Sequence, residues 1–113
     1  MQVLFTSRDA EGAALRELAL RRVRFVMRRM TWLVPRVTVQ LSDVNGPRGG
    51  LDKRCQVQFQ TDRTGSVVIT SIGRDWRAAL DNALARATRV LLRLWRRSQS
   101  QRTPERRALR YDS

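Results

Sequence analysis

Two stretches of this chain place apolar side chains at every second position, with threonine, glutamine or charged residues between them. They lie at 36–44 and 54–62. The apolar positions are Val37, Val39, Leu41, Cys55, Val57 and Phe59. Because successive side chains of a strand point to opposite faces, both stretches predict strands of a sheet that is apolar on one face only. Such a sheet needs a cover on its apolar face, and it leaves the other face in water.

Two further strands complete the predicted sheet. Residues 2–7 (QVLFTS) and 66–72 (SVVITSI) are short runs rich in β-branched and apolar residues. The stretch NGPRGGLDK at 45–53 supplies the glycines and the proline of a long hairpin loop, and TDRTG at 61–65 predicts a tighter turn. The last three strands are therefore expected to be antiparallel neighbours.

Two amphipathic helices are predicted to cover the apolar face. The first extends from Glu11 to about Thr31, and the second from Arg74 or Asp75 to about Ser98. The order β-α-β-β-β-α predicts an α+β fold, a two-layer sandwich with both helices packed on one face of a four-stranded sheet. The first helix would be a right-handed crossover that lays the first strand parallel to the second. Residues 1–98 would form a single domain, followed by a basic, disordered tail at 99–113.

Positive charge is the property that most restricts the function. The 113 residues include 23 basic and 10 acidic ones, which gives a net charge of +13. Such an excess implies a negatively charged partner, with nucleic acid and anionic lipid as the obvious candidates. Every basic residue except Lys53 is arginine, and the planar guanidinium group suits phosphate recognition better than an ammonium group does.

The arginines of the second predicted helix occupy an arc separate from its apolar arc. They are Arg86, Arg89, Arg93, Arg96 and Arg97. Like charges three or four residues apart destabilise an isolated helix by roughly a few tenths of a kcal/mol per pair. A solvated helix face usually carries both signs, so this unrelieved row indicates phosphate contact. The first helix adds Arg21 and Arg28 on its outer face, and Arg22 and Arg29 along the edge of its apolar stripe.

Four longer stretches resemble one known family. They are MQVLFTSR, ALRELALRRV, LSDVNGPRGGLDKRCQV and DWRAALDNALARATR. Together they are similar to the ribosome hibernation promoting factor and ribosome-associated inhibitor family, over residues 1–97. The most specific parts are the NGPRGGLDKRC hairpin and the D-x-x-A-A-L-D start of the second helix. The resemblance implies the same β-α-β-β-β-α sandwich.

The resemblance also implies a function. Family members sit on the small ribosomal subunit in the channel used by messenger and transfer RNA, contact ribosomal RNA with their basic helices, and silence translation when growth stops. The basic family positions fall here on Arg22, Lys53, Arg54, Arg86, Arg89, Arg93 and Arg96. The tail is too short to be the C-terminal dimerisation domain of longer members. We therefore expect a monomer off the ribosome, and leave open whether the protein holds single ribosomes or favours their pairing.

Catalysis finds no support in the sequence. The carboxylates are scattered singly, there is no histidine, and Cys55 alternates towards the predicted core with Val57 and Phe59. We therefore expect no enzyme activity, no metal, no cofactor and no small-molecule substrate. The start lacks a signal-peptide profile and no apolar run is long enough to cross a membrane, so we expect a cytoplasmic protein without a membrane partner.

Several alternatives stay open. The chain could be a general RNA-binding or polyanion-binding module. A peripheral protein of anionic membranes is less favoured, because the apolar arc that would enter lipid is needed to cover the sheet. A regulator that binds an acidic protein is a further possibility. Trp76 is expected in the core, whereas Trp95 lies at the margin of the apolar arc and could either pack there or contact RNA.

Overall fold

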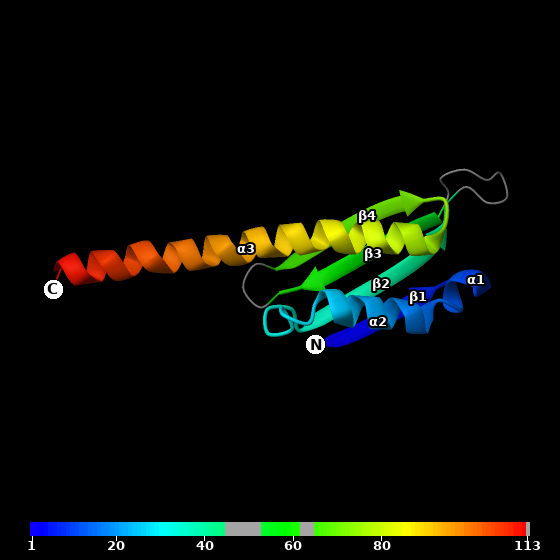
Figure 1. Cartoon of the computed structure of the whole chain (residues 1–113), viewed down its shortest axis with the longest axis horizontal. Helices are drawn as coiled ribbons and strands as arrows, with labels where there is room; N and C mark the ends of the chain where they lie inside the picture. The colour runs from blue at the N-terminus through cyan, green and yellow to red at the C-terminus, as the bar shows by residue number, and fades with distance from the viewer. Residues whose placement is uncertain (45–52, 62–64, 113) are drawn as a thin grey trace.

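The computed structural model describes residues 1–44, 53–61 and 65–112, with the side chains of the last segment described up to residue 97. Four strands form one sheet in the order β1-β2-β3-β4, as Figure 1 shows. Their bounds are Gln2–Ser7 (β1), Arg36–Asp43 (β2), Lys53–Gln60 (β3) and Ser66–Gly73 (β4). β1 is parallel to β2, and the other two pairs are antiparallel. The predicted α+β fold is therefore confirmed. The predicted loop and turn fall largely at 45–52 and 62–64, outside the described residues.

The register of the strands stacks the apolar positions on one face. Val57 pairs with Val39 on one side and with Ile69 on the other. Phe59 pairs in the same way with Val37 and Val67. The buried strand residues are Val37, Val39, Leu41, Cys55, Val57, Phe59, Ile69 and Ser71. The core thus lies on the face that the alternation predicted.

The first predicted helix is two helices followed by turns. α1 spans Ala10–Ala13 and α2 spans Arg16–Val26. A Cβ on the buried Gly12 would collide with the Ser7 hydroxyl, so a larger residue here would force the Ser7 side chain to move. The prediction of one helix to about Thr31 was wrong at its end. Beyond Val26 the chain turns, and Met30 still reaches the core from these turns.

The last helix is longer than the sequence predicted. α3 spans Trp76–Asp112, whereas the sequence predicted its end near Ser98 and a disordered tail beyond. Residues 99–112 contain several strong helix formers, arginine, glutamine, leucine and alanine, against the single helix breaker Pro104. The helix continues well past the sheet in Figure 1, and the longest dimension of the molecule is 67 Å. The division into a domain and a separate tail stays a prediction.

Both helices cover the same face of the sheet. α2 packs beside β1, and α3 packs over β3 and β4 (Figure 1). The apolar arc of α3 enters the core through Trp76, Ala79, Leu80, Ala83, Leu84, Ala87 and Leu91. On the core face of β3, Cys55 has no exposed surface, and burial raises the pKa of its thiol to about 12. The open face of the sheet carries the alternate residues of the strands.

Candidate nucleic-acid interface

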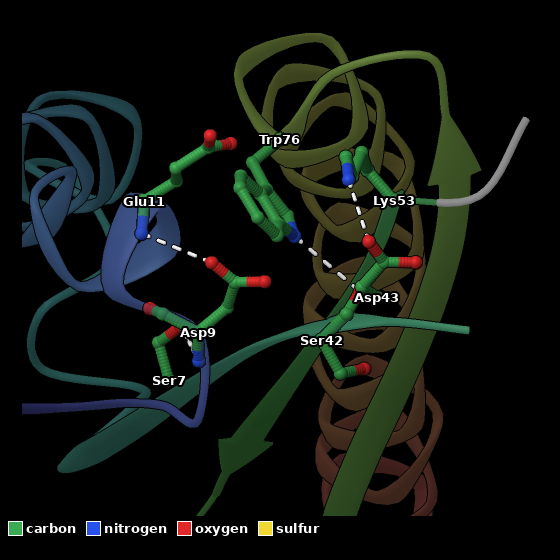
Figure 2. Close-up of polar contacts among 7 residues, drawn as sticks. All are labelled: Ser7, Asp9, Glu11, Ser42, Asp43, Lys53 and Trp76. Atoms are coloured by element: carbon green, nitrogen blue, oxygen red, sulfur yellow. Dashed lines mark hydrogen bonds and ion pairs between the residues drawn. The ribbon is translucent and has the colours of Figure 1, made fainter. Parts of the chain in front are cut away.

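The start of α3 contacts the last residues of β2 and the first residue of β3. The indole N–H of Trp76 donates a hydrogen bond to the Ser42 carbonyl at 3.3 Å, and the Lys53 ammonium lies 4.7 Å from the centre of the indole ring. Lys53 also pairs with Asp43 at 2.7 Å. Figure 2 shows these contacts together at one end of the sheet. The expectation that Trp76 belongs to the core is confirmed, because only 4% of it is exposed.

Five exposed arginines follow α3 on the side away from the core, and we call them the α3 row. They are Arg86, Arg89, Arg93, Arg96 and Arg97. Arg86 donates a hydrogen bond from Nη1 to the carbonyl of Thr70 on β4 at 2.7 Å. This bond places the row on the β4 side of α3, because Arg89 and Arg93 follow Arg86 at helical spacing. The row contains no acidic residue.

The opposite side of α3 faces α2. Arg22 of α2 binds Asp81 of α3 through Nη1 and Oδ1 at 2.9 Å, and both side chains are about 40% exposed (40% and 42%). Arg22 was predicted to bind RNA, and its charge is here partly balanced by a carboxylate. This pairing was not anticipated from the sequence. The signal that could have revealed the pair is a basic residue on one helix, Arg22, and an acidic residue on the other, Asp81, each at the side that faces the neighbouring helix.

The other arginines predicted in the first helical region lie within α2 and in the turns that follow it. Arg21 is exposed within α2, and Arg28 and Arg29 are exposed in the turns that follow. The guanidinium carbon of Arg28 stacks 4.2 Å from the centre of the Phe25 ring, and its Nη1 donates to the Phe25 carbonyl at 2.7 Å. Arg28 is therefore held over an aromatic ring that is 66% exposed.

A groove with a largely apolar lining lies between α2 and α3. Its lining residues are Leu18, Arg21, Arg22, Phe25, Val26, Asp81, Leu84, Ala85 and Thr88. The sides of α2 and α3 that face one another therefore carry apolar residues and an ion pair.

Two tryptophans connect the turns after α2 with α3. The rings of Trp32 and Trp95 meet edge to face, with their centres 6.3 Å apart. Trp32 is 60% exposed, whereas Trp95 is half-buried and its Nε1 lacks a hydrogen-bond partner among the described residues. The structure therefore packs Trp95 against another aromatic ring, and leaves Trp32 as the more accessible of the two.

Lys53 and Arg54 are two of the basic positions that the family resemblance implied, but their side chains lie on opposite faces of the sheet. Lys53 lies on the helix side against Trp76 and Asp43. Arg54 lies on the open side, where its Nη2 donates to Oε1 of Gln56 at 2.8 Å. The structure thus brings the predicted arginines of α3 together and does not bring Arg54 to them.

The chemistry of this surface is that of anion binding. Guanidinium groups on a fixed helix can each donate several hydrogen bonds to phosphate oxygens. In the described part of the chain, no group of three or more His, Cys, Asp or Glu residues could hold a metal ion. Within those same segments, no helix has the length and apolar character that a membrane crossing requires.

Comparison with known proteins identifies the fold. No protein-family model and no curated protein matches the chain. Among solved structures, it is similar to a ribosomal subunit interface protein from Coxiella burnetii, with a TM-score of 0.66 and 14% identity over 83% of this chain and 97% of that one. It is also similar to the N-terminal domain of Protein Y from Thermus thermophilus, with a TM-score of 0.63 and 22% identity over 83% of this chain and 99% of that one. The chain therefore has the fold of these two proteins, which confirms the sequence resemblance at the level of architecture.

Proposed function

We propose that this protein is a ribosome-associated translation inhibitor of the hibernation factor type. It would bind small-subunit ribosomal RNA through its basic helix faces and block the channel used by messenger and transfer RNA. The observation that carries the proposal is the α3 row, five exposed arginines without an acid among them. The similarity of the fold to a ribosomal subunit interface protein supports the ribosome as the partner.

The placement of the row favours contact with a backbone rather than with bases. The arginines repeat along one side of a straight helix, so they can follow successive phosphates of one strand. Arg86 uses Nη1 on the Thr70 carbonyl, which fixes the direction of its side chain and leaves the other guanidinium donors for a phosphate. Arg21, Arg28 and Arg29 would make a second set of phosphate contacts beyond the groove.

Co-sedimentation with ribosomes and with separated subunits tests the proposal. The purified protein is mixed with each at low and at moderate salt, with a structured RNA of similar length as competitor. We expect stoichiometric binding to the small subunit that resists the competitor. Binding to both subunits alike, or binding that the competitor abolishes, would contradict a specific ribosome plug.

The same arginines also favour a second candidate, a general binder of RNA and other polyanions. If the protein has this function, any structured RNA should compete with the ribosome and displace the protein from it. The logarithm of the binding constant should fall by roughly 0.7 to 0.9 per log unit of salt concentration for each neutralised phosphate. Attachment to an anionic membrane is opposed by the apolar arc of α3, since Leu80, Leu84 and Leu91 are at most 2% exposed in the core. Vesicles of anionic lipid serve as the control for that alternative.

A further inference from the structure

The open face of the sheet, which the sequence predicted to face water, holds a hollow. It lies where β1 and β2 end and β3 begins, and it encloses about 490 Å³. The side chains of the open face that line it are Thr6, Arg8, Gln40, Ser42, Arg54 and Gln56. The register places Thr6, Gln40 and Gln56 side by side across three strands. This hollow is on the side of the sheet opposite α2 and α3.

The lining of the hollow has the chemistry of an anion site. Arg8 and Arg54 carry positive charge, and no acidic residue is among the described residues that line the hollow. Arg54 donates to Oε1 of Gln56 at 2.8 Å. Because that bond occupies the acceptor end of the Gln56 amide, its NH₂ end is the part left to donate to a ligand. The hydroxyls of Thr6 and Ser42 can donate as well.

Two described acids that are near in sequence, Asp43 and Asp9, are engaged elsewhere. Asp43 follows Ser42 but points to the helix side, where Lys53 binds its carboxylate at 2.7 Å. Asp9 follows Arg8 but caps α1, accepting a hydrogen bond from the Glu11 amide at 3.0 Å (Figure 2). Neither carboxylate is among the groups that line the hollow. Among the described residues, the positive charge of Arg8 and Arg54 therefore meets no opposing charge in the lining.

We propose that this hollow is a phosphate-binding site. The phosphate can come from the backbone of an RNA strand or from a small free phosphate compound, since the same donors recognise both. The RNA source rests on the proposed function and would give the protein an RNA contact on each side of the sheet. The free source does not depend on that function.

The first measurement titrates inorganic phosphate into the full chain. Saturable shifts of the Gln40 and Gln56 side-chain amide signals in ¹H–¹⁵N NMR spectra are expected. They should disappear in Arg54→Gln and weaken in Arg8→Gln, which replaces an exposed residue outside any strand and leaves the fold intact. The matched control is Arg36→Gln, which removes the same charge from the exposed start of β2, opposite Gln60 at the far end of the same sheet. It should leave the shifts unchanged.

The second measurement compares the affinity of these variants for small-subunit ribosomal RNA at moderate salt. With RNA as the source, Arg54→Gln and Arg8→Gln each weaken binding by roughly tenfold, and Arg36→Gln by less than about twofold. Phosphate shifts without this difference would assign the site to a free phosphate compound. Absent phosphate shifts together with equal RNA affinities would overturn the proposal. Native protein that binds phosphate but no ribosome would overturn the proposed function and leave this site standing.

Discussion

The two faces of the sheet are made by the same strands and have opposite chemistry. On the helix side, β2, β3 and β4 bury valine, isoleucine, phenylalanine and the Cys55 thiol. On the open side, the alternate positions of the same strands hold glutamine, threonine, serine and arginine, together with the half-exposed Val68 and Ile72 of β4. Lys53 and Arg54 are neighbours in the chain, yet one stacks on the Trp76 ring and the other lines the hollow. The difference teaches that a single step along a strand decides whether a cation supports the core or faces a ligand.

The largest effect should come from removing one buried ring of the helix side. Phe59→Ala empties a site with no exposed surface and is expected to cost about 3 to 5 kcal/mol of unfolding free energy. Gln58→Ala, one step along β3 on the open side, should cost less than about 0.5 kcal/mol. Urea unfolding of both variants measures the difference. Similar losses would mean that the open face is covered in solution.

The next prediction separates the effect of surface charge on ribosome binding from the effect of the core on stability. Replacing Arg86, Arg89 and Arg93 of the α3 row together with glutamine should weaken ribosome binding by at least roughly a hundredfold, because each guanidinium loses a charge-assisted contact. The melting temperature should stay close to that of the native protein, since all three side chains are exposed. Co-sedimentation and thermal unfolding provide the two readouts.

A charge-matched control shows whether position matters in that experiment. Arg16, Arg36 and Arg74 are exposed and lie outside the α3 row. Their joint replacement by glutamine lowers the net charge by the same amount. An equal loss of ribosome binding in the two triple variants would show that binding depends on net charge and not on the position of the α3 row.

The exclusion of water from the helix side of the sheet can be tested by measuring the free energy of unfolding as a function of pH. Burial raises the pKa of the Cys55 thiol from 9.0 to about 12, so above pH 9 the unfolded chain releases a proton that the folded protein keeps. The contribution of this thiol to stability is therefore complete below pH 9 and is lost as the pH rises towards 12. Between pH 9 and 10 the native protein should lose about 1 kcal/mol more than Cys55→Ala does. Parallel pH profiles for the two proteins would show that water reaches the thiol.

The smallest effect concerns the ion pair between α2 and α3. The Arg22–Asp81 pair joins α2 to α3 but is about 40% exposed on each side (40% and 42%), so its coupling energy should be about 0.2 to 1 kcal/mol. A double-mutant cycle with Arg22→Gln and Asp81→Asn measures that coupling. Arg22→Gln should in addition weaken RNA binding if its guanidinium also reaches phosphate, whereas Asp81→Asn should not.

Sequence reasoning predicted the parts of the fold that depend on periodicity. The alternation around Val57 and Phe59 fixed which face of the sheet is buried, and the crossover rule placed β1 parallel to β2. The apolar arc of α3 was assigned in the same way, so the exposure of Arg86, Arg89 and Arg93 followed from it. These features are local consequences of the 2.0 and 3.6 residue periods.

The features that the sequence did not reveal depend on contacts between distant residues. The close approach of Gly12 to Ser7 requires the packed position of β1. The Arg22–Asp81 pair requires the spacing of two helices. The hollow requires the register of three strands to bring Arg8 beside Arg54. No local pattern contains these distances.

The parallel placement of β1 has a consequence for the order of folding. β2, β3 and β4 follow one another in the chain and can pair by closing short loops, whereas Gln2 must find Arg36 across the whole of α1 and α2. Closing the longer loop costs more entropy, so β1 should be the last strand to join the sheet. During synthesis it emerges first and yet waits for β2. One strand of the finished sheet is therefore an unpaired, partly apolar segment for most of the time in which the rest of the domain assembles.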